Sequence, residues 1–144
     1  MTGSESDAGI LDKLAKFGIT PESVTLWGTG TPMREFLWSE EMADASVHVL
    51  LNVDFKDTYV TGSRDIRNCH INVGTGKEVS IREVAEIIMK EIGFKGILLW
   101  DSSKPDGTMR KLTDVSKLHS LGWHHKVEID EGIERLYKWY LKGV

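Results

Sequence analysis

The sequence has few of the features that mark secreted, membrane or zinc-binding proteins. Cys69 is the single cysteine among 144 residues, which excludes an internal disulfide and a cysteine-rich zinc site. No apolar run approaches the ~20 residues that a membrane helix needs. The first nine residues have neither the basic nor the apolar region of a signal peptide. We therefore expect a protein of the reducing cytoplasm that enters no membrane.

A strong charge of either sign is also lacking. The chain has 18 basic and 22 acidic residues and a net charge of -4, so no global basic field favours nucleic acid or an anionic membrane as a partner. Any anion site must be local. The hydrophobic fraction of 40% and the length are those of one ordinary globular domain. We expect a disordered tail over residues 1–9 and one domain over residues 10–144.

Common enzymatic motifs are missing as well. A dinucleotide fingerprint starting at Gly28 needs glycine at the position of Met33, and one starting at Gly74 needs glycine at the position of Val79. The sequence contains neither a Gly-x-Ser-x-Gly nucleophile elbow nor a His-x-x-x-His pair. The adjacent histidines 124 and 125 are expected to be polar loop side chains. From motifs alone the chain offers no catalytic residue, no cofactor-binding residue and no metal ligand.

The sequence pattern predicts short strands alternating with helices. Strands are expected over Val24–Trp27, Arg34–Leu37, His70–Val73 and Ile97–Trp100. Helices are expected from about residue 10, from a cap at Ser39, from an S-x-x-E capping box at Ser80, from a cap at Asp114 and from about Ile129. Residues 54–68 have no clear period and are expected to form a surface loop. This order indicates an α/β or α+β domain with a small sheet and several packed helices.

Two loops combine glycine and proline with cations. The first runs from Trp27 to Phe36 and contains Arg34, and the second runs from Lys104 to Lys111. Glycine lets a backbone approach a ligand closely, and the planar guanidinium of arginine matches phosphate oxygens. The alternative is that these cations are merely solvated and that Trp27 belongs to the core. Composition alone does not decide between a phosphate site and an ordinary surface.

Three longer runs give the sequence a specific resemblance. They are WGTGTPMREFLWSEEMADA (27–45), INVGTGKEVSIREVAEII (71–88) and DSSKPDGTMRKLTDVSKLHSLGW (101–123), and the final EIDEGIERLYKWYL (128–141) agrees with them in order and spacing. Over residues 24–141 the chain resembles the GDP-L-fucose synthase family. These are NADP-dependent epimerase-reductases among the extended short-chain dehydrogenases.

The resemblance implies that the chain is the C-terminal substrate-binding part of such a protein, without the Rossmann domain that binds NADP. It implies that Trp27 and Arg34 contact the GDP portion, that Lys111 lies near the diphosphate and that Asp106 lies where a loop reaches the nucleotide. Lys104 and Arg110 are neighbouring candidates. The family's Tyr-x-x-x-Lys catalytic set does not occur in the 144 residues, so no catalytic and no cofactor-binding residue carries over.

The sequence departs from the family pattern at two places. Met109 replaces the usual proline of KPDGTPRK, which implies a less rigid second loop. Residues 38–41 replace a commoner His/Tyr-Val-Asp-Asp, which can still begin a helix, and Glu40 and Glu41 are expected to interact only with its dipole. Asp114 is expected to be a helix cap.

Three functions stay open: the GDP-sugar-binding part of an oxidoreductase, a GDP or GDP-sugar-binding module without chemistry, and an assembly piece. The expected partners are a GDP-sugar nucleotide, a separate Rossmann-domain chain and a second copy of this chain in a homodimer. In the family the helix after Glu41 lies near the domain boundary, so Val49, Leu50 and Ile71 are expected to be partly uncovered.

Overall fold

The computed structural model describes residues 6–60, 62 and 66–143, and the chain divides into two compact units. Unit 1 comprises Met1–Pro32 and Ser80–Arg110, and unit 2 comprises Met33–Val79 and Lys111–Val144. The division falls within residues 10–144, which were expected to form one domain. Residues 7–9, which were expected in the disordered tail, begin a helix, because Ser6 accepts a hydrogen bond from the Gly9 amide and caps it.

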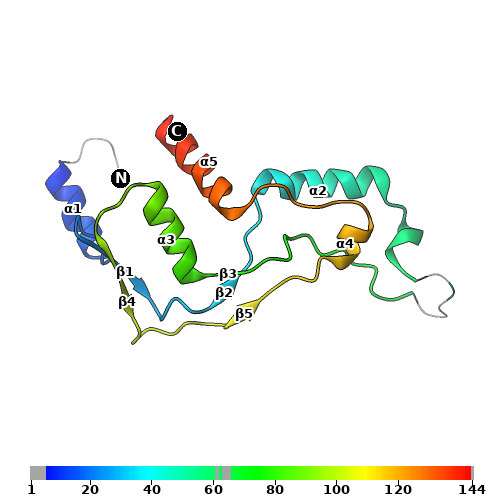
Figure 1. Cartoon of the computed structure of the whole chain (residues 1–144), viewed down its shortest axis with the longest axis horizontal. Coiled ribbons are helices and arrows are strands. Elements are labelled where there is room, and N and C mark those ends of the chain that lie inside the picture. Colours follow the sequence, from blue (N-terminus) through cyan, green and yellow to red (C-terminus); the bar gives the residue numbers. More distant parts are fainter. Residues whose placement is uncertain (1–5, 61, 63–65, 144) are drawn as a thin grey trace. The chain divides into compact units, whose positions relative to one another are not determined.

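Unit 1 is built on two parallel strands, β1 (Ser23–Trp27) and β4 (Ile97–Asp101), which lie side by side in Figure 1. Their register pairs Ser23 with Ile97 and Trp27 with Asp101. Two helices belong to this unit, α1 (Asp7–Ala15) and α3 (Ile81–Glu91). The strands therefore end together at Trp27 and Asp101, and both candidate loops begin at that edge.

Helix α3 begins as its sequence predicts. The Ser80 hydroxyl accepts from the Glu83 amide, and the Glu83 carboxylate accepts from the Ser80 amide at 2.8 Å. This capping box satisfies donors that would otherwise have no partner in the first helical turn. The box fixes where the helix starts, and so which residue, Arg82, stands in its first turn.

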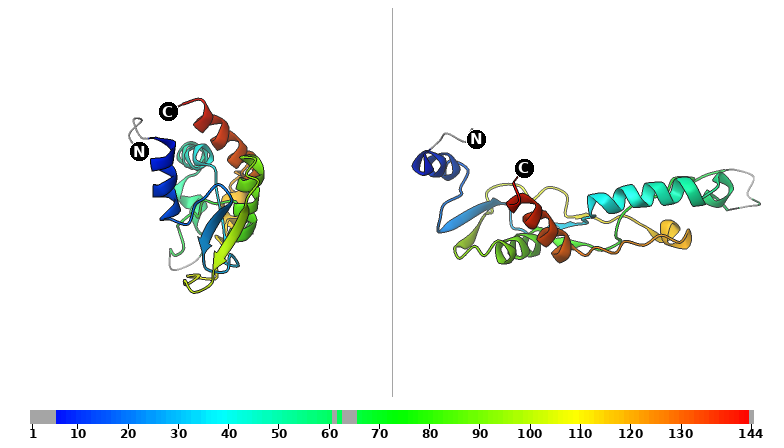
Figure 2. Two further views of the ribbon diagram at one scale, coloured as in Figure 1. Left: turned by 90° about the vertical axis from the view of Figure 1, so that its left-hand side faces the viewer. Right: turned by 90° about the horizontal axis from the view of Figure 1, so that it is seen from above.

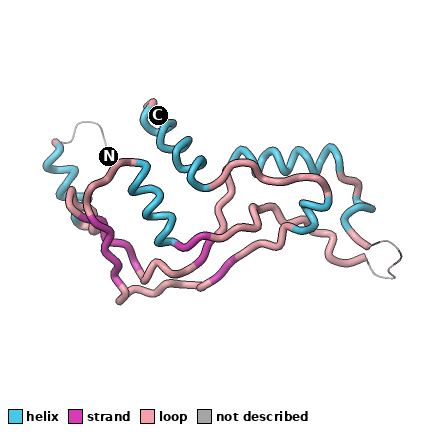
Figure 3. The backbone as a smooth tube through the Cα atoms, in the orientation of Figure 1, coloured by secondary structure: helices cyan, strands magenta, loops and turns pink. Residues whose placement is uncertain are grey.

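Unit 2 consists mainly of helices joined by long loops, as the backbone tube of Figure 3 shows. Its helices, which Figure 2 shows in two further views, are α2 (Ser39–Asn52), the 3-10 helix η1 (Phe55–Thr58), α4 (Ser116–Ser120) and α5 (Ile129–Leu141). The buried core joins Ala45 of α2 with Leu118 of α4 and Trp123. Leu37, Val49, Ile71 and Val73 pack against this cluster.

Three strands of two residues each lie where the chain passes from one unit to the other. They are β2 (Met33–Arg34), β3 (Val79–Ser80) and β5 (Arg110–Lys111), in the order β3-β2-β5. Together with the parallel pair, this confirms the expected combination of small sheets and helices. The motif GTPMREF contributes β2, and the motif KPDGTMRK contributes β5.

Several expected elements differ from the structure. The segment 70–73 is not a strand, because none of the strands in the described part of the chain pairs with it. The strand expected over Arg34–Leu37 is only Met33–Arg34. Ser39 is the first residue of α2 and not its cap, a position that Trp38 takes without a side-chain hydrogen bond. The loop expected over residues 54–68 contains η1, and its residues 61 and 63–65 lie outside the described residues.

The outer face of α2 is apolar and exposed. Leu50 is 81% exposed and Leu51 73% exposed. Of the three residues expected to be partly uncovered, Leu50 is exposed, whereas Val49 and Ile71 are partly buried and pack against the core of unit 2. No helix within the described ranges is long and apolar enough to cross a membrane.

Candidate functional site

The first loop begins with Trp27 at the end of β1, and its indole is 73% exposed. The alternative that Trp27 belongs to the core is therefore wrong. The ammonium group of Lys104 lies over the indole at 5.6 Å from the ring centroid, a cation–π distance. Unit 1 thus presents an exposed aromatic face with a cation beside it. Such a pair suits a planar, negatively charged ligand such as a nucleotide.

Asp106 faces the first loop. One carboxylate oxygen accepts from the Thr29 amide at 2.6 Å and the other from the Thr29 hydroxyl at 2.8 Å. These two hydrogen bonds hold the pKa of Asp106 below its usual value, although partial burial acts the other way. Asp106 is consequently ionised at neutral pH, and both of its oxygens already have a donor. The carboxylate stabilises the turn that follows Trp27.

Arg34 and Lys111 belong to unit 2, where they stand on the neighbouring strands β2 and β5. Arg34 is partly buried and donates one hydrogen bond from Nη1 to the Met33 carbonyl at 2.6 Å, while Lys111 is exposed. A guanidinium has five N–H donors, so this single bond leaves others for a ligand. Arg110, the first residue of β5, is exposed and belongs to unit 1.

The six predicted residues therefore fall into two groups. Unit 1 holds Trp27, Lys104, Asp106 and Arg110, and within it Trp27 lies near Lys104. Unit 2 holds Arg34 and Lys111 on adjacent strands. That all six contribute to one ligand site stays a prediction. No group of three or more metal-ligating side chains occurs among residues 6–60, 62 and 66–143.

Comparison with known proteins places this arrangement in a family. A sequence model of the NAD dependent epimerase/dehydratase family matches residues 2–74. The chain belongs to this family. The family match covers the first candidate loop, and the relatives below cover most of the chain.

GDP-L-fucose synthase of Escherichia coli (strain K12) is 46% identical over 120 residues, which are 83% of this chain and 36% of that protein. GDP-L-fucose synthase 1 of Arabidopsis thaliana is 50% identical over 123 residues, 85% of this chain and 34% of that protein. The chain thus spans about a third of the length of these curated relatives.

The structure of a GDP-D-glycero-L-gluco-heptose synthase from Campylobacter jejuni, in the presence of NADPH, is also similar. It is 42% identical, superposes with a TM-score of 0.84, and the match covers 95% of this chain and 38% of that one. The names of these relatives share GDP and differ in the sugar. The resemblance to GDP-L-fucose synthase and the fold of extended short-chain dehydrogenases are confirmed.

Sequence reasoning missed Glu35, which lies inside the GTPMREF motif of this family member. Its carboxylate accepts from the amides of Thr75 at 2.7 Å, Gly76 at 2.6 Å and Thr113 at 3.1 Å. Burial raises the pKa of Glu35, but hydrogen bonds from Thr113, Gly76 and Thr75 outweigh it, and the net shift is downward. A side chain on Gly74 would meet this carboxylate at 2.5 Å. The sequence contained a sign of this role, because Glu35 directly follows Arg34 inside the motif.

Glu41 was expected only to interact with the helix dipole, and this is wrong. Its side chain is 8% exposed, and Oε1 accepts from the amides of Lys126 and Val127. The carboxylate therefore ties the loop before α5 to the start of α2. Asp114 was expected to be the cap of α4, but that position belongs to Val115. The Asp114 carboxylate, one residue earlier, accepts from the Ser116 amide at 3.0 Å. Helix patterns alone could not reveal Glu41, because its partners lie 85 and 86 residues away.

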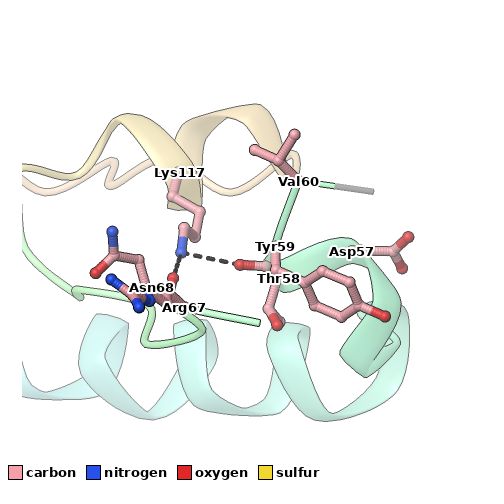
Figure 4. A pocket seen from close by; sticks show the side chains of 7 residues that line it. All are labelled: Asp57, Thr58, Tyr59, Val60, Arg67, Asn68 and Lys117. Carbon is pink, nitrogen blue, oxygen red and sulfur yellow. Dashed lines mark hydrogen bonds between the residues drawn. The ribbon is translucent and has the colours of Figure 1, made fainter. Parts of the chain in front are cut away.

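A second polar feature of unit 2 is a pocket of about 420 Å³, shown in Figure 4, whose lining includes Tyr59, Arg67 and Lys117. The Lys117 ammonium group donates to the carbonyl oxygens of Thr58, Asn68 and His70. All three of its protons are used in this way, so Lys117 holds chain segments together and does not point a free charge at the pocket.

Proposed function

We propose that this chain is the GDP-sugar-binding part of an NADP-dependent GDP-sugar epimerase-reductase of the GDP-L-fucose synthase type. The observation that carries the proposal is the exposed Trp27 with Lys104 over its ring, at the edge where β1 and β4 end. An indole face can cover a base, and a cation beside it offsets phosphate charge. The similarity to proteins named for GDP-sugar synthesis supports GDP as the nucleotide.

We propose Arg34 and Lys111 as the contacts of the diphosphate. Arg34 offers a planar fork for two phosphate oxygens, and Lys111 on the neighbouring strand adds a point charge. Asp106 contributes to the site by stabilising the turn that follows Trp27. We propose no catalytic residue in this chain, because the 144 residues contain no Tyr-x-x-x-Lys set and no dinucleotide fingerprint. NADP would be bound by a Rossmann-type domain, and a hydride donor is needed for the reduction.

Calorimetric titration with GDP tests the site. The wild-type chain, Arg34→Ala and Lys111→Ala are compared with Arg135→Ala, which removes an arginine paired with Glu131 on exposed α5. A charge-assisted contact to phosphate is worth about 1.5–3 kcal/mol, so Arg34→Ala should weaken GDP binding by roughly ten- to a hundredfold. Lys111→Ala should weaken it less, and Arg135→Ala should leave it unchanged. Equal GDP affinity in the wild type and the Arg34/Lys111 double variant would refute the site.

The alternative is a binding or assembly module that takes no part in chemistry. NADPH fluorescence separates the two cases when the chain is mixed with a Rossmann-type fragment of a relative. Fluorescence enhancement and GDP-sugar turnover that require both polypeptides support the enzyme part, whereas GDP binding with no turnover supports the module. The chain alone should give no saturable NADPH signal.

The exposed apolar face of α2, which includes Leu50 and Leu51, supports a protein partner. We propose that a Rossmann-domain chain covers it, with a homodimer as the competing outcome, since uncovered apolar surface favours association. Sedimentation of wild type and Leu50→Lys distinguishes them. A homodimer through this face should dissociate in the variant, whereas a partner-specific face should leave the lone chain unchanged and abolish only the mixed complex. The cytoplasmic location stays a prediction.

A further inference from the structure

Thr29, which neither motif singles out as a ligand contact, uses every polar group that it has. Its amide and hydroxyl donate to the two oxygens of Asp106. Its carbonyl accepts from Nη2 of Arg82 at 2.7 Å. The hydroxyl also lies 2.7 Å from the Thr31 hydroxyl. The turn after Trp27 is therefore held from two sides through one residue.

Arg82 reaches this turn from the first turn of α3. Its own amide donates to the Gly30 carbonyl at 2.9 Å, so the backbone and the side chain of Arg82 bind two adjacent residues of the turn, Gly30 and Thr29. Its guanidinium stacks on the Trp100 indole, 4.5 Å from the ring centroid. The capping box at Ser80 and Glu83 fixes the helix start from which Arg82 projects. The position of the guanidinium is thus set by helix geometry and by a stacked ring.

The two glycines of the turn leave no space for a side chain. A Cβ on Gly30 would lie 2.6 Å from the Trp100 ring, and one on Gly28 would overlap the Asp106 carboxylate. Both residues have positive φ, 79° for Gly28 and 76° for Gly30. The Gly28 amide donates to the Asp101 carbonyl at 2.9 Å, which continues the pairing of β1 with β4. The turn is packed, hydrogen-bonded and anchored to the strand that ends at Trp27.

We propose that Arg82 and Asp106 are positioning residues for the nucleotide site. Arg82 binds the carbonyl of Thr29 and Asp106 binds its amide and hydroxyl, and together they fix the turn next to Trp27. The inference rests on the proposed function, because it assigns these residues to the same site. It replaces the expected direct contact of Asp106 with the nucleotide by an indirect role. It also adds Arg82, which lies outside both glycine-proline loops.

The charge state of Asp106 agrees with this role. Its two hydrogen bonds from Thr29 lower its pKa, which means that the ionised carboxylate is bound more tightly than the protonated one. An ionised acid repels a phosphate group, so a direct contact between Asp106 and a diphosphate is unfavourable. Both Asp106 oxygens already accept from Thr29, which agrees with a role in holding the turn.

The first arm of the test needs no ligand. In the wild-type chain the Thr29 amide resonance should shift with pH, with a midpoint below the ordinary aspartate value of about 3.9. Asp106→Asn should abolish that titration, and Asp12→Asn, an exposed control on α1, should not. A Thr29 amide that follows no carboxyl titration would overturn the proposal, even if GDP binds.

The second arm compares nucleotides. Asp106→Asn and Arg82→Ala should each weaken GDP binding by about tenfold, because a binding residue that is no longer preorganised loses affinity. A positioning role predicts the same loss for inosine diphosphate and for 2′-deoxy-GDP. A direct contact with the base or ribose predicts unequal losses, which would refute the role of Asp106. Arg82→Lys should lose less than Arg82→Ala if charge matters, and more than the Asp12 control because the planar fork is gone.

The two arms keep the two proposals apart. If the wild-type chain binds no GDP at millimolar concentration, the proposed function fails, and the Thr29 titration still decides whether Asp106 holds the turn. If GDP binds and the titration is absent, the proposed function stands and the positioning role fails.

Discussion

The two units of the chain hold their backbones in different ways. In unit 1 the two parallel five-residue strands form a ladder, and a braced turn follows one of them. All five buried hydrophobic residues of the described chain belong to unit 2: Ala45, Val115, Leu118, Trp123 and Val127. Unit 2 has long loops, and the side chains of Glu35, Glu41 and Lys117 bind backbone amides and carbonyls of those loops.

Because of this difference, we expect substitutions in unit 2 to affect mainly stability and substitutions in the turn of unit 1 to affect mainly ligand binding. The backbone of a loop has no neighbouring strand, so a carboxylate or ammonium group that binds several of its amides or carbonyls supplies the missing hydrogen bonds. Loss of that one side chain leaves all of these backbone groups without a partner. We therefore expect unit 2 to lose stability through single polar or core substitutions. In unit 1, substitutions in the turn should affect the local backbone and the ligand site before they affect the core.

The largest expected effect comes from the core of unit 2. Leu118 is 0% exposed, so Leu118→Ala should lower the free energy of unfolding by about 3 kcal/mol through lost burial and a cavity. The matched control Leu50→Ala, at an exposed position of α2, should change it by less than about 0.5 kcal/mol. Urea unfolding followed by circular dichroism measures both. Equal losses would show that the face around Leu50 is packed in solution.

The next effect concerns Glu35. Replacing it by glutamine keeps the size but removes the charge, and one of the two acceptor oxygens becomes an N–H₂ donor. That donor then faces either the Thr113 amide or the amides of Thr75 and Gly76, which should cost about 1.5–3 kcal/mol. Glu86→Gln, an exposed change on α3, serves as the control and should be neutral. Thermal melts at neutral pH compare them. If Glu35→Gln melts with the wild type, the loops around Thr75 and Thr113 do not depend on this carboxylate.

A smaller effect is expected from Gly30→Ala in unit 1. The new Cβ would meet the Trp100 ring, and the positive φ adds strain, so the local cost should be about 1–3 kcal/mol. Gly93→Ala, with φ of 70° and no atom within 4 Å of its Cβ, carries the strain without the clash. Hydrogen exchange should therefore quicken in β1 and β4 more for Gly30→Ala than for Gly93→Ala, with α2 unchanged. Faster exchange in α2 as well would mean that the two units share one unfolding transition.

The smallest effect is a pH dependence of unit 2. Burial lowers the pKa of His119, and the charges of His124 and His125 lower it further. Its ring stacks on that of His124 at 4.1 Å, and its Nε2 is buried without a partner. The folded state thus resists protonation, so this part of the stability is complete above the unfolded pKa of about 6.5 and decreases as pH falls below it.

This dependence is measured as the difference between the melting temperatures at about pH 7.5 and about pH 5.5. Both pH values lie above the ordinary pKa values of aspartate and glutamate, so carboxylate titration contributes little to the difference. The decrease should be smaller in His119→Gln, which cannot take up a proton. An identical decrease in the variant would place the effect on another group.

Much of this architecture was predictable from local patterns. The strands β1 and β4, the capping box of α3 and the start of α5 follow from apolar spacing, caps and glycines. The loops that carry Trp27 and Asp106 were found from their glycines, proline and charges. The segment 70–73 was wrongly predicted as a strand, because the apolar pattern of a sequence reports burial and not whether a neighbouring strand is present.

What could not be predicted is which side chains bind distant backbone. Glu35 bonds to amides 40, 41 and 78 residues away, and Arg82 to a carbonyl 53 residues away. Such bonds have no sequence period, because they depend on how loops meet in space. The direct nucleotide contact expected of Asp106 came from family resemblance, which gives a residue's neighbourhood and not the atom it faces.

The three carbonyl bonds of Lys117 also bear on how this protein can change length. Thr58 and Asn68 are joined at one ammonium group, so the ends of the connection between them are fixed by α4 and not by the residues in between. Closing a longer connection costs only about 0.6 kcal/mol for each doubling of its length. Insertions there should leave the core of unit 2 intact as long as Lys117 is retained, so a peptide tag can be placed in this connection.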